Sequence, residues 1–170
     1  CVYGQTKLAG EQEVKRNCRK YVILRTAWVF SEYGNNFVKT MLRLGAERGV
    51  LSVVADQVGC PTYAGDIAKA CLEVCLAEQE CRARYGLYHY CGDEAVSWHG
   101  FASEIYRQAS TRGVLTEVPK LTAITTAQYP TPATRPIYSV MATAKLGRDF
   151  GVVASQWKSA LNNVLAKLDN

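Results

Sequence analysis

Residues 1–30 read CVYGQTKLAGEQEVKRNCRKYVILRTAWVF and contain the first two secondary-structure elements that the sequence predicts. Residues 3–17 are rich in good helix formers such as Gln5, Leu8 and Glu11. Residues 20–30 form a continuous run of apolar, β-branched and aromatic side chains, which is typical of a strand buried on both faces. A helix that leads directly into a buried strand indicates an α/β protein.

The rest of the chain continues this alternation. The apolar periodicities predict further strands over 50–56 and 86–92 and further helices over 37–49, 66–79, 97–110 and 155–168. Asn35 or Asn36 can cap the helix at 37–49, and Ser97 can cap the helix that follows it. Helices that alternate with strands in this way predict an α/β sheet with mainly parallel pairing.

Two segments lack a clear periodicity. Residues 57–65, QVGCPTYAG, are predicted to form a loop. Residues 114–141 contain four of the five prolines together with several Ser and Thr residues, so this segment is predicted to be mostly extended and irregular.

The seven cysteines fit neither a disulfide framework nor a zinc site, because their number is odd and no C-x-x-C pair occurs. His89 and His99 are the only histidines, and no zinc-ligand spacing includes them, so we expect no metal site. Both histidines are interpreted as structural or surface residues. Buried free thiols in a reducing cytoplasm are the simplest interpretation of the cysteines. The inward face of the helix at 66–79 is predicted to be made of Ile67, Ala70, Cys71, Val74 and Cys75.

Composition and charge describe an ordinary globular protein. A chain of 170 residues has room for one domain or a domain and a half, and 48% of its residues are hydrophobic. No apolar run approaches the roughly 20 residues needed to cross a bilayer, so we expect no membrane partner and a cytoplasmic location. The net charge of +5 is modest, and its one basic cluster, at 15–20, is interpreted as a solvated helix end. We therefore expect no nucleic-acid partner.

Tyr3 and Lys7 form the first pattern with chemical meaning. At a spacing of i, i+4 their side chains lie on one face of the predicted helix. An ammonium group beside a phenol favours the phenolate, which is useful in proton transfer. The pair has an alternative explanation, because ten tyrosines would often give one such spacing by chance.

Glycine-rich turns of the dinucleotide-binding type, G-x-G-x-x-G, do not occur in the sequence. Gly45, Gly49 and Gly59 are isolated and do not lie between a predicted strand and helix in the required way. The chain is therefore expected to be the later part of a larger α/β protein.

Four segments, taken in order, carry a more specific resemblance. They are YGQTKLAGE (3–11), VILRTAWVFSEYGNNFVKTMLRLG (22–45), LSVVADQVGCPTYAGDIA (51–68) and YPTPATRPIYSVMATAKL (129–146). Together they resemble the dTDP-4-dehydrorhamnose reductases of the extended short-chain dehydrogenase/reductase superfamily, from residue 1 to about residue 165. The resemblance implies the C-terminal part of an NAD(P)-binding Rossmann-like fold with a small α/β substrate-binding domain. Residues 1–30 would belong to the Rossmann-like domain, and residues 31–170 mainly to the substrate-binding domain, with returning Rossmann elements.

The resemblance also implies a reaction, in which NADPH or NADH reduces the C4 ketone of dTDP-4-dehydro-L-rhamnose to give dTDP-L-rhamnose. Hydride addition to a carbonyl creates an alkoxide, which needs a proton donor. Tyr3 would give this proton, and Lys7 would favour the phenolate and hydrogen-bond the nicotinamide ribose. Thr26 and Ala27 would approach the nicotinamide carboxamide through their backbone groups.

Substrate-binding residues are also expected from the resemblance. Trp28 would pack on the sugar ring and Arg135 would pair with the diphosphate, for which a guanidinium is well suited. The alternatives are a core tryptophan and a surface arginine. Asn36 would touch the diphosphate or simply cap a helix. Gln57, Pro61 and Thr62 would wall the substrate cleft, although Pro61 also suits a turn.

Several expectations concern the whole protein. Because the glycine-rich cofactor loop is missing, we expect the 170 residues alone to be inactive and to bind NADPH poorly. A homodimer is possible in such a family. Two alternative functions stay open at this point, which are a non-catalytic regulatory or binding relative and another nucleotide-sugar epimerase or dehydratase.

Overall fold

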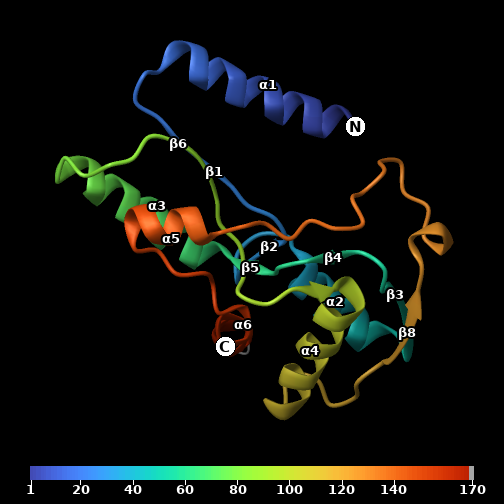
Figure 1. The fold of residues 1–170 in the computed structure, drawn as a ribbon. Helices are drawn as coiled ribbons and strands as arrows, with labels where there is room; N and C mark the ends of the chain where they lie inside the picture. Colours follow the sequence, from blue (N-terminus) through green and yellow to red (C-terminus); the bar gives the residue numbers. More distant parts are fainter. Residues whose placement is uncertain (169–170) are drawn as a thin grey trace.

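The computed structural model of the chain describes residues 1–168 and has a mixed α/β architecture (Figure 1). Its helices are α1 Val2–Asn17, α2 Phe37–Glu47, α3 Ala64–Gln79, α4 Trp98–Thr111, α5 Ala144–Phe150 and α6 Trp157–Leu168, with a 3₁₀ turn, η1, at Thr126–Gln128. Its strands are β1 Val22–Arg25, β2 Val29–Phe30, β3 Val50–Val54, β4 Val58–Gly59, β5 Thr62–Tyr63, β6 Gly86–His89, β7 Val96–Ser97 and β8 Lys120–Ile124.

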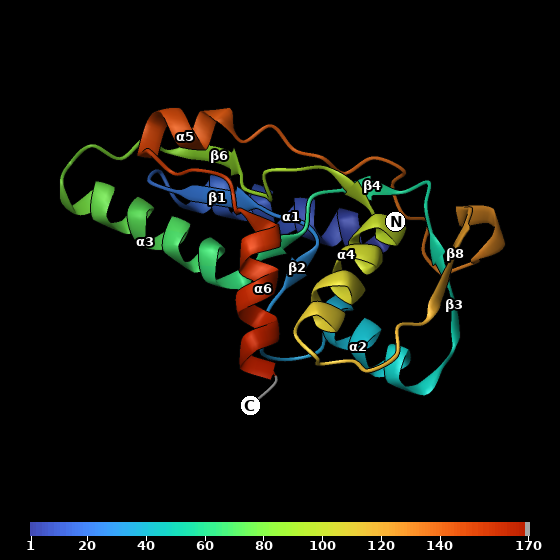
Figure 2. The same cartoon turned by 90° about the horizontal axis from the view of Figure 1, so that it is seen from below.

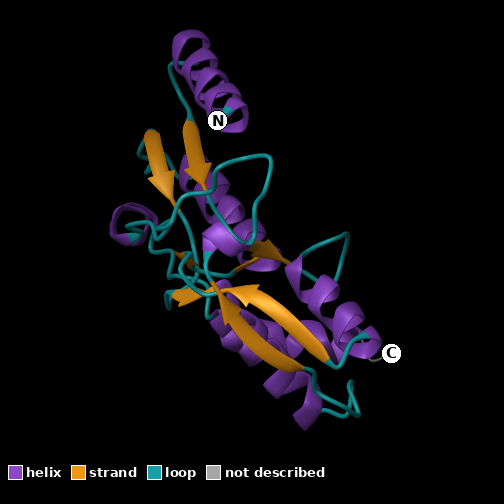
Figure 3. Cartoon of the chain, turned by 90° about the vertical axis from the view of Figure 1, so that its right-hand side faces the viewer, coloured by secondary structure: helices purple, strands orange, loops and turns teal. Residues whose placement is uncertain are grey.

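The strands of the described residues form four two-stranded sheets. The pairs β1–β6, β2–β5 and β3–β8 are parallel, and β4–β7 is antiparallel. The two longest pairs, β1–β6 and β3–β8, lie in different parts of the molecule (Figure 3). The prediction of an α/β fold with mainly parallel pairing is therefore confirmed. The proposed domain division at residue 30 stays a prediction.

The continuous buried strand predicted over 20–30 is wrong. The structure divides it into β1 and β2, which are separated by a turn in which Trp28 has a left-handed φ of 54°. β1 is only partly buried, and Phe30 is the one residue of the run that is fully buried. The residues of this run are apolar, but the turn at Trp28 directs the chain from the β1–β6 sheet into the β2–β5 sheet.

Two buried clusters hold the fold together. The larger one joins β2, β3, α2, α4 and α6 through residues such as Phe30, Val38, Phe101 and Leu161. The smaller one packs Ala70 and Ala77 of α3 and Leu146 of α5 around Tyr88 of β6. Apolar side chains removed from water in this way are the main favourable term in folding.

Helix α2 approaches α4 closely at Gly45. A Cβ at this position would lie 2.6 Å from the Tyr106 ring, so only glycine fits without displacing it. The Tyr106 hydroxyl donates a hydrogen bond of 2.7 Å to the carbonyl of Met41. Burial raises the pKa of Tyr106 to about 12, because the phenolate would lose its hydration there. This contact fixes the helix that forms one wall of the cavity described below.

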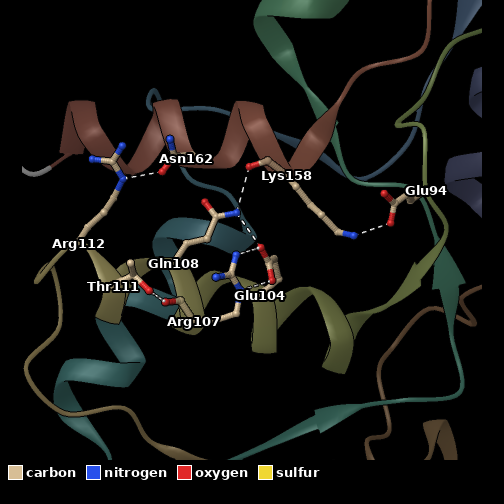
Figure 4. A network of polar contacts seen from close by, with 8 residues as sticks. All are labelled: Glu94, Glu104, Arg107, Gln108, Thr111, Arg112, Lys158 and Asn162. Atoms are coloured by element: carbon tan, nitrogen blue, oxygen red, sulfur yellow. Dashed lines mark hydrogen bonds and ion pairs between the residues drawn. The ribbon is translucent and has the colours of Figure 1, made fainter.

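Helix α6 lies alongside α4 and is joined to it by polar side chains (Figures 2 and 4). The Gln108 amide donates to the Glu104 carboxylate at 2.8 Å and to the Lys158 carbonyl at 3.0 Å. Arg112 donates to the side-chain oxygen of Asn162 at 2.8 Å. These bonds fix α6 against the helix whose first residue enters the cavity.

The predicted inward face of α3 is partly wrong. Cys71 and Cys75 are exposed, whereas Ala70 and Ala77 are buried. Cys60 and Cys91 are buried and the other five cysteines are exposed, so the expectation of buried thiols holds for two of the seven. The real inward stripe follows the spacing of Ile67, Ala70, Val74 and Ala77, and the two cysteines lie just beyond its edge.

Other boundaries agree with the sequence to within a few residues, but short elements were missed. The predicted loop at 57–65 contains β4 and β5, and the segment predicted to be irregular contains β8 and η1. Helix α5 was not predicted either. In the residues that the structure describes, no helix combines the length and apolar character needed to cross a membrane.

Helix α1 stands apart from the rest of the molecule and has no buried residue (Figures 1 and 3). It is joined to β1 by an ion pair, in which Arg25 Nε and Nη2 each donate to a carboxylate oxygen of Glu11 at 2.7 Å. This hydrogen-bonded guanidinium lowers the pKa of Glu11.

Glu32 ties the loop after β2 to two other elements. Its carboxylate accepts hydrogen bonds from the Tyr63 hydroxyl at 3.1 and 3.2 Å and pairs with Lys167 of α6. The side chain of Glu32 is 8% exposed. The Lys167 hydrogen bond is the main cause of a lowered pKa for Glu32.

Replacing Glu32 by Gln is expected to lower the free energy of unfolding by about 1–2 kcal/mol at pH 7. Because the folded-state pKa of Glu32 is lowered, its stabilisation is complete above the unfolded-state value of about 4.3 and is lost as the pH falls. Urea unfolding of both proteins at a series of pH values checks this. A difference that stays constant down to about pH 3 would show that the carboxylate charge is not the cause.

Candidate functional site

A cavity of about 460 Å³ lies in the half of the molecule that contains β3 and β8. A cavity of this size can enclose a small organic ligand. Its walls are formed by the turn before β2, by α2 and β3, by the start of α4 and by the loop that follows η1. The lining residues are Trp28, Val29, Phe37, Thr40, Met41, Leu44, Leu51, Ser52, Val53, Val54, Gln57, Trp98, Tyr129, Thr131 and Arg135.

One corner of the cavity is aromatic. The rings of Trp28 and Trp98 stack with their centroids 3.5 Å apart and their planes 7° from parallel. Phe37 contacts the Trp98 ring at a centroid distance of 4.7 Å. One face of each indole is therefore taken up by the other, which limits how Trp28 can present itself to a ligand.

Trp28 has a strained backbone. A φ of 54° is unusual for a bulky residue and costs about 1–3 kcal/mol, which the surroundings must offset. The amide of Thr62 donates to the Trp28 carbonyl at 3.0 Å and helps to hold this conformation. Gly59 leaves room for the indole, since a Cβ there would lie 2.4 Å from Trp28 Cε2. Strained residues of this kind cluster at binding sites.

The turn η1, which directly precedes the loop that lines the cavity, is held in place by Asp56. The Asp56 carboxylate accepts from the amide of Thr126 at 2.9 Å and from its hydroxyl at 2.7 Å. These hydrogen bonds lower the pKa of Asp56. Gln57, which is 6% exposed, donates from its side-chain amide to the same Thr126 hydroxyl at 3.1 Å. The adjacent side chains of Asp56 and Gln57 thus both hold Thr126, the first residue of η1, from which the loop continues.

The same loop is held at its other end by β4. The amide of Val58 donates to the Ile137 carbonyl, and the amide of Ser139 donates to the Val58 carbonyl, both at 2.8 Å. Between these two anchors, Tyr129, Thr131 and Arg135 reach the cavity. Among the described lining residues, Arg135 is the only charged one. An anionic group in the cavity would therefore meet this guanidinium.

Three of the predicted substrate residues, Trp28, Gln57 and Arg135, line the cavity together. Asn36 instead caps α2, where its side-chain oxygen accepts from the amide of Lys39 at 3.3 Å. The Asn36 amide group also donates to the carbonyl of Ser31 at 2.8 Å. The helix-cap interpretation of Asn36 is therefore confirmed, and the structure does not place this residue among those that line the cavity.

Pro61 and Thr62 lie behind the cavity wall. Both are buried, and Thr62 is completely enclosed. The Thr62 hydroxyl donates to the Cys60 carbonyl at 3.0 Å and accepts from the amide of Gly92 at 3.3 Å. Neither residue is among those that line the cavity, and Thr62 supports the turn at Trp28 through the hydrogen bond from its amide to the Trp28 carbonyl.

Tyr3 and Lys7 lie on one face of α1, as their spacing predicts. The Lys7 ammonium is 5.5 Å from the centre of the Tyr3 ring, and Tyr3 is 70% exposed. The N-terminal end of α1, which carries this pair, points toward the half of the molecule that contains β3 and β8 (Figures 1 and 2). Thr26 is exposed and Ala27 is partly buried in the turn between β1 and β2.

Trp98 was not identified from the sequence as a site residue. It follows the Ser97 N-cap, whose side chain accepts from the amide of Gly100 at 3.0 Å. An aromatic residue at the start of a helix carries no signal that it faces Trp28, which is 70 positions earlier. Within residues 1–168, no cluster of three His, Cys, Asp or Glu residues could hold a metal ion.

The sequence of the chain matches the RmlD substrate binding domain family over residues 1–170. It is 48% identical over 169 residues to the dTDP-4-dehydrorhamnose reductase of Aggregatibacter actinomycetemcomitans, covering 98% of this chain and 57% of that protein. It is 41% identical over 170 residues to the enzyme of the same name from Salmonella typhimurium, covering 98% of this chain and 56% of that protein. The chain thus spans little more than half the length of these relatives.

Solved structures show the same relationship. A dTDP-4-dehydrorhamnose reductase from Clostridium acetobutylicum matches with a TM-score of 0.87 and 40% identity, covering 99% of this chain and 56% of the other. The enzyme of that name from Bacillus anthracis, in complex with NADP, matches with a TM-score of 0.80 and 36% identity, covering 98% and 55%. A UDP-glucose 4-epimerase from Stenotrophomonas maltophila, at 14% identity and a TM-score of 0.73, shares the fold alone. The chain belongs to the RmlD substrate binding domain family.

Proposed function

We propose that this chain provides the substrate pocket and the proton donor of an NADPH- or NADH-dependent dTDP-4-dehydrorhamnose reductase. The observation that supports this most strongly is the cavity, in which one guanidinium and two stacked indoles lie among apolar and hydroxyl side chains. This is a suitable environment for a sugar joined to a nucleoside diphosphate. The names of the relatives point to the same substrate.

The residues of this chain have distinct roles in the proposed reaction. The nicotinamide cofactor, when bound, supplies the hydride that adds to the C4 carbon. Tyr3 gives its hydroxyl proton to the C4 oxygen as charge develops there, which turns the ketone into an alcohol. Lys7 stabilises the phenolate that is left, and its remaining donors suit the hydroxyl groups of a ribose.

The exposure of Tyr3 and Lys7 fits a site completed by a cofactor. Their side chains lie on a helix face that has no buried residue, and a phenol and an ammonium are the donor types that a nicotinamide ribose would require. Thr26 and Ala27, at the carboxyl end of β1, would offer backbone groups to the carboxamide. The Bacillus anthracis structure contains NADP, which favours NADPH for this chain.

The substrate would be held by the cavity. Arg135 would pair with the diphosphate oxygens, and the edge of Trp28 would contact the sugar, because one of its faces is covered by Trp98. Gln57 would act mainly through its hydrogen bond to Thr126, which positions the loop that carries Arg135. The homodimer and the cytoplasmic location stay predictions.

The experiment that tests this function joins the chain to the part of the Aggregatibacter relative that the alignment leaves unmatched. The fusion should oxidise NADPH when dTDP-4-dehydro-L-rhamnose is added, whereas the chain alone should show no turnover. Binding of dTDP-L-rhamnose without any reduction would favour the non-catalytic alternative. Absence of binding by a folded fusion would contradict the proposed function altogether.

Replacing Arg135 by Gln is expected to weaken the binding of dTDP about 10- to 100-fold, because a hydrogen-bonded charge partner of the diphosphate is lost. Isothermal titration calorimetry with dTDP measures this. Arg112→Gln is the matched control, since Arg112 bonds to Asn162 between α4 and α6 and is not a lining residue. Equal affinities in the two variants would show that Arg135 does not hold the diphosphate.

A further inference from the structure

The proposed reaction gives no direct role to Trp98, which is part of the aromatic corner of the cavity. Its ring stacks on Trp28 at 3.5 Å and contacts Phe37 at 4.7 Å, and all three residues line the cavity. The Trp98 ring therefore links the turn before β2, through Trp28, with helix α2, through Phe37.

The position of Trp98 is itself well fixed. It is the first residue of α4, and the Ser97 cap holds that end of the helix. The β4–β7 pair places Gly59 opposite Val96, two residues before Trp98. Gly59 and Trp98 both contact the Trp28 indole, so a single strand pair positions both of these neighbours.

The backbone of Trp28 is held by a hydrogen bond, whereas the orientation of its side chain depends on packing contacts. The Thr62 amide holds the carbonyl of Trp28, and pairing of Val29 with Thr62 continues the β2–β5 sheet from there. The indole extends from this strained residue into an open cavity. Stacking on Trp98 covers one face of the indole and limits its rotation.

We propose that Trp98 is a positioning residue, which holds the Trp28 indole where it contacts the sugar of the substrate. The proposal rests on the proposed function only for the identity of the ligand. If it is right, removal of the Trp98 ring should weaken the binding of the sugar part specifically, because Arg135 and not Trp28 would hold the diphosphate.

The first test follows the Trp28 ring directly by ¹⁹F NMR of protein labelled with 5-fluorotryptophan. The three tryptophans give three resonances, which substitution of each by Phe assigns. In Trp98→Leu, which keeps an apolar but smaller side chain and loses the stacked ring, the Trp28 resonance should lose its ring-current shift and broaden. The resonance of the buried Trp157 should stay unchanged.

The second test compares two ligands, dTDP and dTDP-L-rhamnose, by calorimetry with the reductase fusion described above. Trp98→Leu should weaken dTDP-L-rhamnose about tenfold and leave dTDP within about twofold. Trp98→Phe keeps an aromatic ring and should recover most of the affinity. His99→Leu alters the next residue of α4, which is not a lining residue, and should change neither ligand.

The outcomes separate the two proposals. An unchanged Trp28 resonance in Trp98→Leu, or an equal loss of affinity for both ligands, would overturn the positioning role while leaving the proposed function intact. Failure of the unaltered protein to bind either ligand would contradict the proposed function, and the positioning role with it. A selective loss for dTDP-L-rhamnose that Trp98→Phe restores would support the inference.

Discussion

Replacing Tyr3 by Phe in the reductase fusion is expected to slow ketone reduction about 10²- to 10⁴-fold while leaving the binding of NADPH within about twofold. The aromatic ring stays beside Lys7, so the substitution removes only the hydroxyl that would protonate the C4 oxygen. Single-turnover oxidation of NADPH measures the rate, and a fluorescence titration measures the affinity.

The control for this variant is Tyr33→Phe. Tyr33 is 78% exposed and lies outside both α1 and the cavity lining, so the loss of its hydroxyl should not alter the rate. Full activity of Tyr3→Phe would remove Tyr3 as the proton donor. A parallel loss of NADPH affinity would instead show that the substitution disturbs cofactor binding.

Long, periodic elements of this fold were predictable from sequence. α2 and α4 carry one apolar stripe each, and the caps Asn36 and Ser97 mark where they begin. α5 is not among the helices predicted from the sequence, although its sequence contains helix signals. Leu146 and Phe150 are spaced one turn apart and are both buried, and Gly151 ends the helix with a φ of 72°. β8 gave no comparable signal, since it pairs with β3 alone and most of its residues are exposed.

The turn at Trp28 shows where local sequence reasoning ends. Apolar residues on both sides of it predict one long strand, and no local preference favours a left-handed φ for tryptophan. The amide of Thr62 holds the Trp28 carbonyl and the ring of Trp98 stacks on its indole, and both residues are distant in the sequence. Contacts of this kind are set by the tertiary fold, which composition and periodicity do not describe.

The candidate site was predictable to a similar extent. Trp28, Gln57 and Arg135 were identified through the resemblance, and the structure brings them to one cavity. Pro61 and Thr62 were identified in the same way, but both are buried and neither is among its lining residues. The segment 57–62 contains both a residue that lines the cavity, Gln57, and residues that do not, Pro61 and Thr62. The sequence alone does not distinguish these two kinds of residue.

Replacing Gly92 by Ala is expected to lower the free energy of unfolding by about 3 kcal/mol. A Cβ at this position would lie 2.1 Å from the carbonyl oxygen of Pro61 and 3.1 Å from Trp157 Cδ1. The Pro61 oxygen belongs to buried backbone, so it cannot move aside as a flexible side chain could. Urea unfolding followed by circular dichroism measures the loss.

A displacement of Pro61 in this variant should also displace Trp28, which lines the cavity. Thr62, the next residue, hydrogen-bonds the Trp28 carbonyl, so dTDP-L-rhamnose should bind more weakly as well. Gly49→Ala is the matched control, because a Cβ at Gly49 meets no atom within 4 Å. Equal stability of the two variants would contradict the described contact between Gly92 and Pro61.

The most direct measurement of the central claim is the distance between the Tyr3 hydroxyl oxygen and the C4 oxygen of dTDP-L-rhamnose, in a crystal structure of the fusion with NADP. The account predicts a hydrogen-bond distance of about 2.6–3.2 Å, with the sugar beside Trp28 and the diphosphate on Arg135. A Tyr3 hydroxyl that lies out of reach, with a different acidic group on the C4 oxygen, would contradict it.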